Sequence, residues 1–237
     1  MKILYLILLF LLPLVQSARA LGVTWGSEFA SVFRDSYGNS LDNTFYIQLG
    51  FFQDTVPGTE FVPDASNVAE WVTQWKVFDE ASINLAGPGV HDYYSSEAWV
   101  NLDGSSSSLD PNVSLGLNFV GEKAYVWLRN SDTPSPETEW FLARAESWVF
   151  PEGDDDCCDY ELAAQWSVSD LVSGSVAPIW GRQTTEIGDG FDHTDGLTNT
   201  YDIQTLTFIP EPSSFLMAVL GSSLLLRRRR DQVIPSA

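Results

Sequence analysis

The chain has 237 residues, of which 32 are acidic and 12 are basic, so its formal net charge is −20 at neutral pH. A surface this acidic repels nucleic-acid phosphates and anionic lipid headgroups, which excludes a nucleic-acid-binding protein. Aromatic residues make up 13% of the chain, and this excludes intrinsic disorder because burying aromatic surface offsets the entropy lost on ordering.

The first 20 residues are predicted to be a secretory signal peptide. Lys2 supplies a positive n-region, residues 3–15 form an apolar run, and Ala18 and Ala20 define a small-x-small cleavage site. The alternative is a buried helix or a membrane anchor, but the apolar run is shorter than the ~20 residues of a transmembrane helix. We therefore expect the export machinery to receive the chain and signal peptidase to cut after Ala20.

Strand signals dominate residues 21–209, which are predicted to form a single, mainly β domain. The predicted strands are rich in β-branched and aromatic residues and are bounded by turn residues. They cover residues 44–52, 97–102, 113–120, 123–129, 138–150 and 201–209, with a hairpin over residues 118–125 that turns at Gly121 and Glu122. Polar connectors between short strands favour a β-sandwich or jelly-roll-like fold.

Residues 64–86 are the exception, and here the sequence predicts a helix. Ser66 and Asn67, followed by Glu70, resemble an N-cap with a nearby acid. Five apolar residues then fall at helical spacing, namely Val68, Trp71, Val72, Trp75 and Phe78. A second, short helical turn is predicted at residues 166–171, giving one or two short helices in the domain.

The only cysteines are adjacent, Cys157 and Cys158. Thiolate metal sites normally use separated pairs such as C-x2-C, so the pair does not indicate zinc. In an exported protein the two thiols can form a vicinal disulfide, whose Cα separation is shorter than usual. Free or intermolecularly paired cysteines are the alternative.

Asp189, Asp192 and Asp195 are candidate calcium ligands. They lie in a stretch of alternating carboxylates that ends at Gly196, and carboxylate oxygens are the ligands that Ca²⁺ prefers. The order of acids before Gly196 is not that of an EF-hand, and a solvated turn is the alternative. Residues 154–156 with Asp159 form a second cluster with the same two interpretations. We expect no obligatory cofactor, with calcium as the single candidate.

Patterns typical of enzymes are missing from the sequence. His91 and His193 do not have metal-ligand spacing, and no G-x-S-x-G motif is present. Among 30 acids in residues 21–209, some pair will always suit glycoside cleavage, so carboxylate pairs give no signal. The sequence therefore predicts a protein that is not an enzyme, with a secreted hydrolase as an alternative.

Some tryptophans are candidates for a sugar-stacking platform. The candidates are Trp99, Trp127, Trp140, Trp148 and Trp180. We expect at least three quarters of them to lie in the core, because tryptophan is a large, highly buried residue.

The C-terminal residues 210–237 combine three features in a fixed order. Pro210, Glu211 and Pro212 come first, and the two prolines start the next segment sharply because they cannot continue a helix. The apolar residues 213–226 would span about 21 Å as a helix, less than the ~30 Å hydrocarbon core of a bilayer. Four arginines follow and would hold this end on the cytoplasmic side; they are Arg227, Arg228, Arg229 and Arg230.

This tail resembles the PEP-CTERM sorting signal of bacterial exported proteins, with the Pro-Glu-Pro of residues 210–212, an apolar helix and a basic cluster. Residues 71–78 and 139–150 also resemble uncharacterised PEP-CTERM proteins of environmental bacteria, verrucomicrobial ones in particular. The resemblance implies an exosortase-like membrane transpeptidase as partner, in bacteria that make extracellular polysaccharide.

Together these features predict an exported protein that is anchored in the membrane at least transiently and then reaches the cell surface or extracellular matrix. The Pro-Glu-Pro motif would be recognised by the exosortase-like enzyme, and the arginines would act as a topological stop. The alternative is a secreted carbohydrate- or calcium-dependent binding module that acts on matrix polysaccharide, and a secreted hydrolase is the second alternative.

Overall fold

The computed structural model describes residues 21–27, 31–83, 93–133, 135, 137–152, 164–171, 178–184 and 202–207. This part of the chain is mainly β, as predicted. Its strands are β1 Leu21–Gly26, β2 Phe33–Arg34, β3 Tyr46–Phe52, β4 Trp75–Ala81, β5 Ser95–Val100, β6 Tyr125–Arg129, β7 Glu139–Ala143, β8 Ala164–Ser167, β9 Arg182–Thr184, β10 Asp202–Gln204 and β11 Leu206–Thr207. The helices described are α2, Val68–Gln74, and the 3-10 helix η1, Val168–Leu171.

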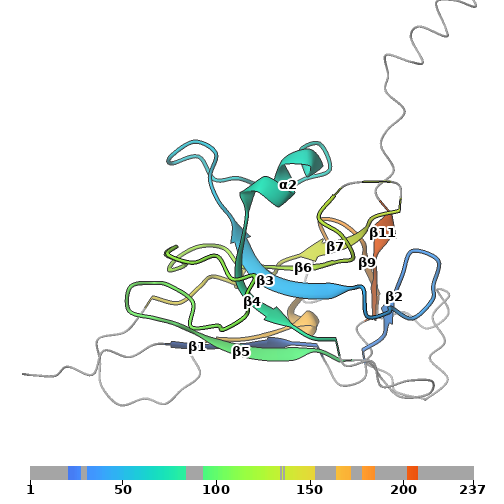
Figure 1. Cartoon of the computed structure of the whole chain (residues 1–237), viewed down its shortest axis with the longest axis horizontal. Helices are drawn as coiled ribbons and strands as arrows, with labels where there is room; N and C mark the ends of the chain where they lie inside the picture. Colours follow the sequence, from blue (N-terminus) through green and yellow to red (C-terminus); the bar gives the residue numbers. More distant parts are fainter. Residues whose placement is uncertain are drawn as a thin grey trace, which may run out of the picture.

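The described strands form three sheets. The largest has the order β11-β7-β6-β3-β4 and is antiparallel throughout. In the second, β1 is antiparallel to β5 and parallel to β8; in the third, β10 is parallel to β2 and antiparallel to β9. Figure 1 shows α2 on one side of the large sheet and the β1–β5 pair on the other.

Both faces of the large sheet are buried, because side chains alternate between two hydrophobic clusters. We call the cluster shared with the β5-β1-β8 sheet the inner core; it includes Leu49 and Leu128 of the large sheet and Trp25 of β1. The cluster on the α2 side is the outer core, which includes Trp71 of α2 and Trp127 of β6. Two-sided burial explains why every residue of β6 and β7 is buried.

The predicted helix over residues 64–86 is wrong in its second half. Helix α2 ends at Gln74, and the chain continues directly into β4. A shift of register between Leu49 and Gly50 of β3 places a β-bulge in β4. Before the bulge, Trp75 and Val77 face the outer core, whereas Phe78 belongs to the inner core. A bulged strand buried on both faces thus reproduces the apolar spacing of a helix.

Asn67 is the N-cap residue, within the predicted pair, but its side chain makes no capping hydrogen bond. Its Oδ1 instead accepts hydrogen bonds from the backbone N–H of Asp64, at 2.9 Å, and from Trp71 Nε1, at 2.7 Å.

Among the described residues, no helix is long and apolar enough to cross a membrane.

The strand predictions for residues 44–52, 97–102 and 123–129 are confirmed within a few residues by β3, β5 and β6. The strand predicted at 113–120 is wrong, because these residues form turns and loop. The predicted hairpin is wrong as well: a turn lies at Gly121, but Lys123 bridges to Val149 and not to the preceding segment. The partner strand comes from residues further along the chain, which local sequence does not reveal.

Two predicted strands are divided in the structure. The strand at 138–150 ends as β7 at Ala143 and is followed by a turn before Val149. The strand at 201–209 breaks at Thr205, with β10 in the third sheet and β11 in the large sheet. The short turn predicted at 166–171 is confirmed in part by η1.

Candidate functional site

Most residues singled out from the sequence lie outside the described residues. These are Ala18, Ala20, Cys157, Cys158, Asp189, Asp192, Asp195, Pro210, Glu211, Pro212, Arg227, Arg228, Arg229 and Arg230. Their predicted roles in cleavage, sorting, disulfide formation and calcium binding therefore stay predictions. The tryptophans are described, and two further features of the fold were not foreseen.

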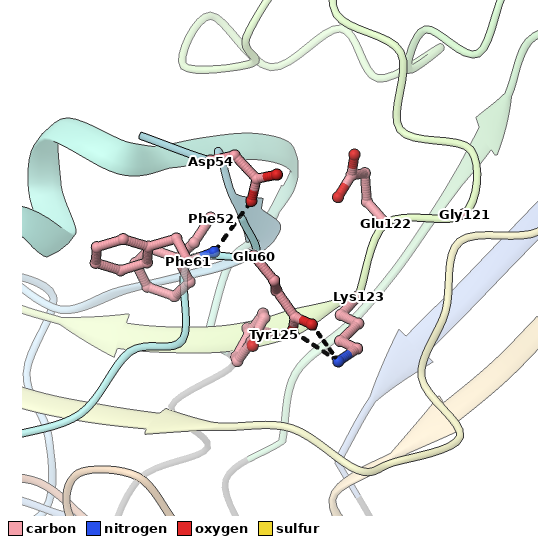
Figure 2. Close-up of a pocket in the computed structure, with 8 residues that line it drawn as sticks. All are labelled: Phe52, Asp54, Glu60, Phe61, Gly121, Glu122, Lys123 and Tyr125. Carbon is pink, nitrogen blue, oxygen red and sulfur yellow. Dashed lines mark hydrogen bonds and ion pairs between the residues drawn. The ribbon is translucent and has the colours of Figure 1, made fainter. Parts of the chain in front are cut away.

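The first unforeseen feature is a pocket of about 200 Å³ at one end of the large sheet (Figure 2). Its walls come from the end of β3, the loop that follows, the turn at Gly121 and the start of β6. Phe52, Phe61 and Tyr125 supply aromatic surface. Three carboxylates and one ammonium group, those of Asp54, Glu60, Glu122 and Lys123, complete the lining.

Local hydrogen bonds hold these carboxylates in place. Asp54 Oδ1 accepts a hydrogen bond from the backbone N–H of Phe61 at 3.0 Å, which closes the loop between them. On the other wall Gly121 has a φ of 76°, a conformation that favours glycine, so the chain turns there and presents Glu122 to the pocket. The Phe61 ring packs on Phe52 with 5.5 Å between centroids, which joins the loop to β3.

The pocket is negatively charged. Lys123 Nζ lies 2.6 and 2.7 Å from the two carboxylate oxygens of Glu60, so these two charges neutralise each other. In the described part of the chain, neither Asp54 nor Glu122 has an ion-pair partner, and Figure 2 shows them on opposite sides of the pocket. Burial, together with the charges of Asp54 and Glu60, raises the pKa of Glu122. Burial is the larger cause, and the two neighbouring carboxylates add to it.

Tyr125 adds a phenol hydroxyl to the pocket. The residue is only 3% exposed, and burial raises the pKa of its phenol. Its hydroxyl has no hydrogen-bond partner among the described residues. The hydroxyl is not one of the fully buried polar atoms that lack a partner, and the Arg144 guanidinium lies 5.5 Å from the centroid of the Tyr125 ring.

The second unforeseen feature is a buried cation at the other end of β6. Arg129 is 4% exposed, and its guanidinium lies 3.8 Å from the centroid of the Trp127 ring. Its Nε donates to Tyr46 Oη at 3.0 Å and lies 2.8 Å from Asp132 Oδ1, while Nη2 donates to Gln48 Oε1 at 2.8 Å. Burial is the main cause that raises the pKa of Tyr46 to about 12. Its charge is paired with Asp132, whereas Nη1 is buried without a hydrogen-bond partner among the described residues. The contacts of Nε, Nη2 and the Trp127 ring make Arg129 a structural residue beside the outer core.

All nine tryptophans are described, and they confirm that most of the sugar-stacking candidates are core residues. Trp127, Trp140 and Trp148 are buried, and Trp180 is partly buried against the outer core. Trp99 is 42% exposed, the only exposed tryptophan of the chain. It lies on β5 directly opposite Gly22 of β1, so its partner on β1 places no side chain beside the ring.

No family model matches this chain, and neither a curated protein nor a solved structure matches it. In the ranges that the structure describes, no group of three or more His, Cys, Asp or Glu side chains is arranged to hold a metal ion. The remaining candidate features are the two ends of the sequence, the surface around Trp99 and the pocket.

Proposed function

We propose that the chain is an exported bacterial surface or matrix protein, without enzymatic activity, that an exosortase-like enzyme sorts through its C-terminal tail. The observation that carries the proposal is the order of Pro-Glu-Pro, apolar segment and arginines in residues 210–230. The position of the fold supports it. Strand β1 begins at Leu21, directly after the proposed cleavage site, and β11 ends at Thr207, three residues before Pro210. The described strands therefore lie between the two proposed signals.

The proposed scaffold is a β-sandwich. It is supported by the inner core, in which residues of the large sheet pack against residues of the β5-β1-β8 sheet. The parallel pairs β1–β8 and β2–β10 depart from the antiparallel order of a jelly roll. Residues 21–209 hold 30 acidic and 6 basic residues, and this charge would keep an exported domain soluble.

The sorting proposal is tested by replacing Pro210, Glu211 and Pro212 with alanine together. The unchanged protein should be recovered from the envelope and medium of its host with an intact mass that runs from Leu21 to the vicinity of Pro212. The triple variant should keep the mass of residues 213–237 and be lost from the surface, because the enzyme no longer recognises its motif. The matched control is alanine at Asp231 and Gln232, beyond the arginines. Normal processing and display of the triple variant would contradict the proposal.

A second candidate function is polysaccharide binding, and the exposure of Trp99 favours it. A tryptophan that lies on a sheet opposite a glycine offers a flat apolar surface, and sugar rings also have apolar faces. Thr24 and Glu97 form the neighbouring cross-strand pair, two residues along each strand and thus on the same face of the sheet. The exposed Glu97 carboxylate supplies hydrogen-bonding capacity next to the ring, whereas the Thr24 hydroxyl is buried.

Replacing Trp99 with alanine should weaken binding to host polysaccharide about 10-fold or more, because buried tryptophan contacts carry much of the energy of an interface. The free energy of unfolding should fall by about 1 kcal/mol or less, since 42% of the residue is exposed. Affinity electrophoresis in gels that contain the polysaccharide measures the first effect, and urea unfolding measures the second. Tyr37→Ala, at an exposed turn, is the matched control. Equal retardation of all three proteins would exclude Trp99 as the binding surface.

A further inference from the structure

We propose that the outward face of the β5-β1-β8 sheet binds an uncharged polysaccharide chain, and that Glu97 and Gln165 hydrogen-bond to its hydroxyl groups beside the Trp99 ring. The inference rests on the second candidate function, polysaccharide binding, and adds to it the class of ligand and two binding residues. Three features of this face support it: a row of unpartnered polar side chains, the absence of basic residues from the three strands, and an open surface beside a fixed aromatic ring.

The outward face is defined by the alternation of side chains along the three strands. Val23, Trp25 and Trp166 are buried in the inner core, so the residues next to them in each strand point away from it. Figure 1 shows the β1–β5 pair at the lower edge of the described fold, with β3 and β4 above it. The face that points away from the inner core is therefore an outer surface of the sandwich.

A row of polar side chains crosses this face. Thr24 of β1 is paired with Glu97 of β5 on one side and with Gln165 of β8 on the other. Since neighbouring strands lie about 4.8 Å apart, the row spans about 10 Å. The next row, about 7 Å further along the strands, contains Trp99. A ligand that covers both rows meets an aromatic ring and polar side chains together.

The polar groups of this row are unused within the part of the chain that the structure describes. Glu97 and Gln165 are exposed, and neither side chain has a hydrogen bond or an ion pair there. Thr24 Oγ1 also lacks a partner but is buried, so binding is assigned to the two exposed side chains. A carboxylate accepts hydrogen bonds and a carboxamide donates and accepts them, which suits sugar hydroxyls.

Trp99 is held on a fixed backbone. Its N–H donates a hydrogen bond to Ser107 Oγ at 2.8 Å, and its carbonyl oxygen accepts one from Ser107 N–H at 2.9 Å. Strand β5 is thus hydrogen-bonded to β1 on one edge and to Ser107 on the other. A binding surface that is already ordered loses little freedom when it binds, and this favours affinity.

The charge of the face favours an uncharged ligand over a polyanion. Strands β1, β5 and β8 contain no Lys or Arg, and Glu97 is their only charged residue. Residues 21–209 together hold 30 acidic and 6 basic residues. This surface would repel a uronate-rich or sulfated chain, and none of the three strands supplies a cation to offset the repulsion. The matching ligand is a chain whose polar groups are neutral hydroxyls.

The open surface favours a polymer over a free sugar. Small ligands bind in concave pockets that bury most of their surface, and neither Glu97, Trp99 nor Gln165 lines the pocket at Gly121. A chain that extends over both rows makes several weak contacts at once. The monosaccharides released from the chain by hydrolysis should therefore compete far more weakly than the chain itself.

Affinity electrophoresis of the purified protein tests the class of ligand. Anion exchange separates the extracellular polysaccharide of the host into a neutral and an acidic fraction, and each fraction is cast into a native gel. The neutral fraction should retard the protein and the acidic fraction should not. Equal or stronger retardation by the acidic fraction, if lost in Trp99→Ala, would overturn this inference and leave polysaccharide binding in place. No retardation by either fraction would overturn the candidate function and the inference with it.

Variants locate the ligand on the face. Glu97→Ala should weaken binding to the neutral fraction about 10-fold and Gln165→Ala about 5-fold, since each removes hydrogen bonds to the ligand. Glu97→Gln should stay within about 3-fold of the unchanged protein, because an amide also hydrogen-bonds to hydroxyls. A loss in Glu97→Gln as large as in Glu97→Ala would indicate a positively charged ligand and would overturn the uncharged class.

The matched controls are Glu137→Ala and Gln53→Ala, which remove exposed side chains of the same kinds from outside the three strands. Both controls should be retarded like the unchanged protein. The urea midpoints of all these variants should stay close to that of the unchanged protein, because the replaced side chains are exposed. Retardation of Glu97→Ala and Gln165→Ala equal to that of the controls would overturn the assignment to this face.

Discussion

Replacing Trp71 with alanine should lower the free energy of unfolding by about 3–5 kcal/mol, the range observed when large aromatic residues are removed from cores. Trp71 is fully buried, and its ring lies 5.9 to 6.1 Å from the rings of Phe52, Trp127, Trp140 and Trp180. Alanine would leave a cavity at the centre of the outer core that these rigid rings cannot fill. It would also release Asn67, which accepts a hydrogen bond from Trp71 Nε1.

Urea unfolding followed by tryptophan fluorescence measures this effect, with Trp99→Ala as the matched control. The control removes the same kind of side chain from a position on β5 that is 42% exposed and should lower the stability by only about 1 kcal/mol or less. Trp71→Phe should fall between the two, because it restores most of the ring packing. A Trp71→Ala protein with the stability of the control would mean that α2 does not anchor the outer core.

Short-range sequence patterns predicted the strands that have continuous apolar runs. They failed at residues 75–81, where a helix and a bulged strand have the same spacing of apolar residues. Trp71, Trp75 and Phe78 are spaced by four and three residues, which fits a helix face. The same spacing arises when a helix runs into a strand and a bulge then moves Phe78 to the opposite face. Only the pairing with β3 separates the two cases, and this pairing is set by residues about 25 positions earlier.

The exposure of Trp99 could have been predicted from β5 alone. Ala98 and Val100 are buried, whereas Glu97 and Trp99 are exposed, so the strand has the alternation of a half-buried sheet. Trp127 and Trp140 instead lie in continuous apolar and aromatic runs, residues 125–128 and 140–143, with the polar Arg129 and Glu139 only at one end of each run, and such runs indicate burial on both faces. Alternation thus separates a surface tryptophan from core tryptophans without a structure.

The pocket could not be predicted in this way. Glu60 and Lys123 are 63 residues apart in the chain, and Asp54 and Glu122 are two acids among the 30 of residues 21–209. Only Lys123 could have indicated an ion pair here, because basic residues are rare in this part of the chain and each has many acids with which to pair. The choice of Glu60 as its partner follows from the fold of the 53–61 loop, which long-range packing on Phe52 determines.

The second large effect is expected at Glu139, a buried carboxylate that joins three distant segments. It is only 6% exposed, and it accepts hydrogen bonds from Ser36 N–H at 2.9 Å, Ser36 Oγ at 2.7 Å and Thr205 Oγ1 at 2.6 Å. Glu139→Ala should lower the free energy of unfolding by about 3 kcal/mol or more, because hydrogen bonds to a charged group contribute about 1.5–3 kcal/mol each and are not fully additive. Chemical denaturation measures the loss.

Glu137→Ala is the matched control, since this exposed glutamate lies two residues earlier and should change the stability by less than ~0.5 kcal/mol. Hydrogen exchange adds a local test. Thr205 links β10 in the third sheet to β11 in the large sheet, and Glu139 is its side-chain partner, so amide protection at residues 203–207 should fall more than protection in β3 and β6. Uniform loss of protection across all sheets would mean that Glu139 stabilises the whole fold and not this connection. Unchanged stability would show that the third sheet is held by its backbone hydrogen bonds alone.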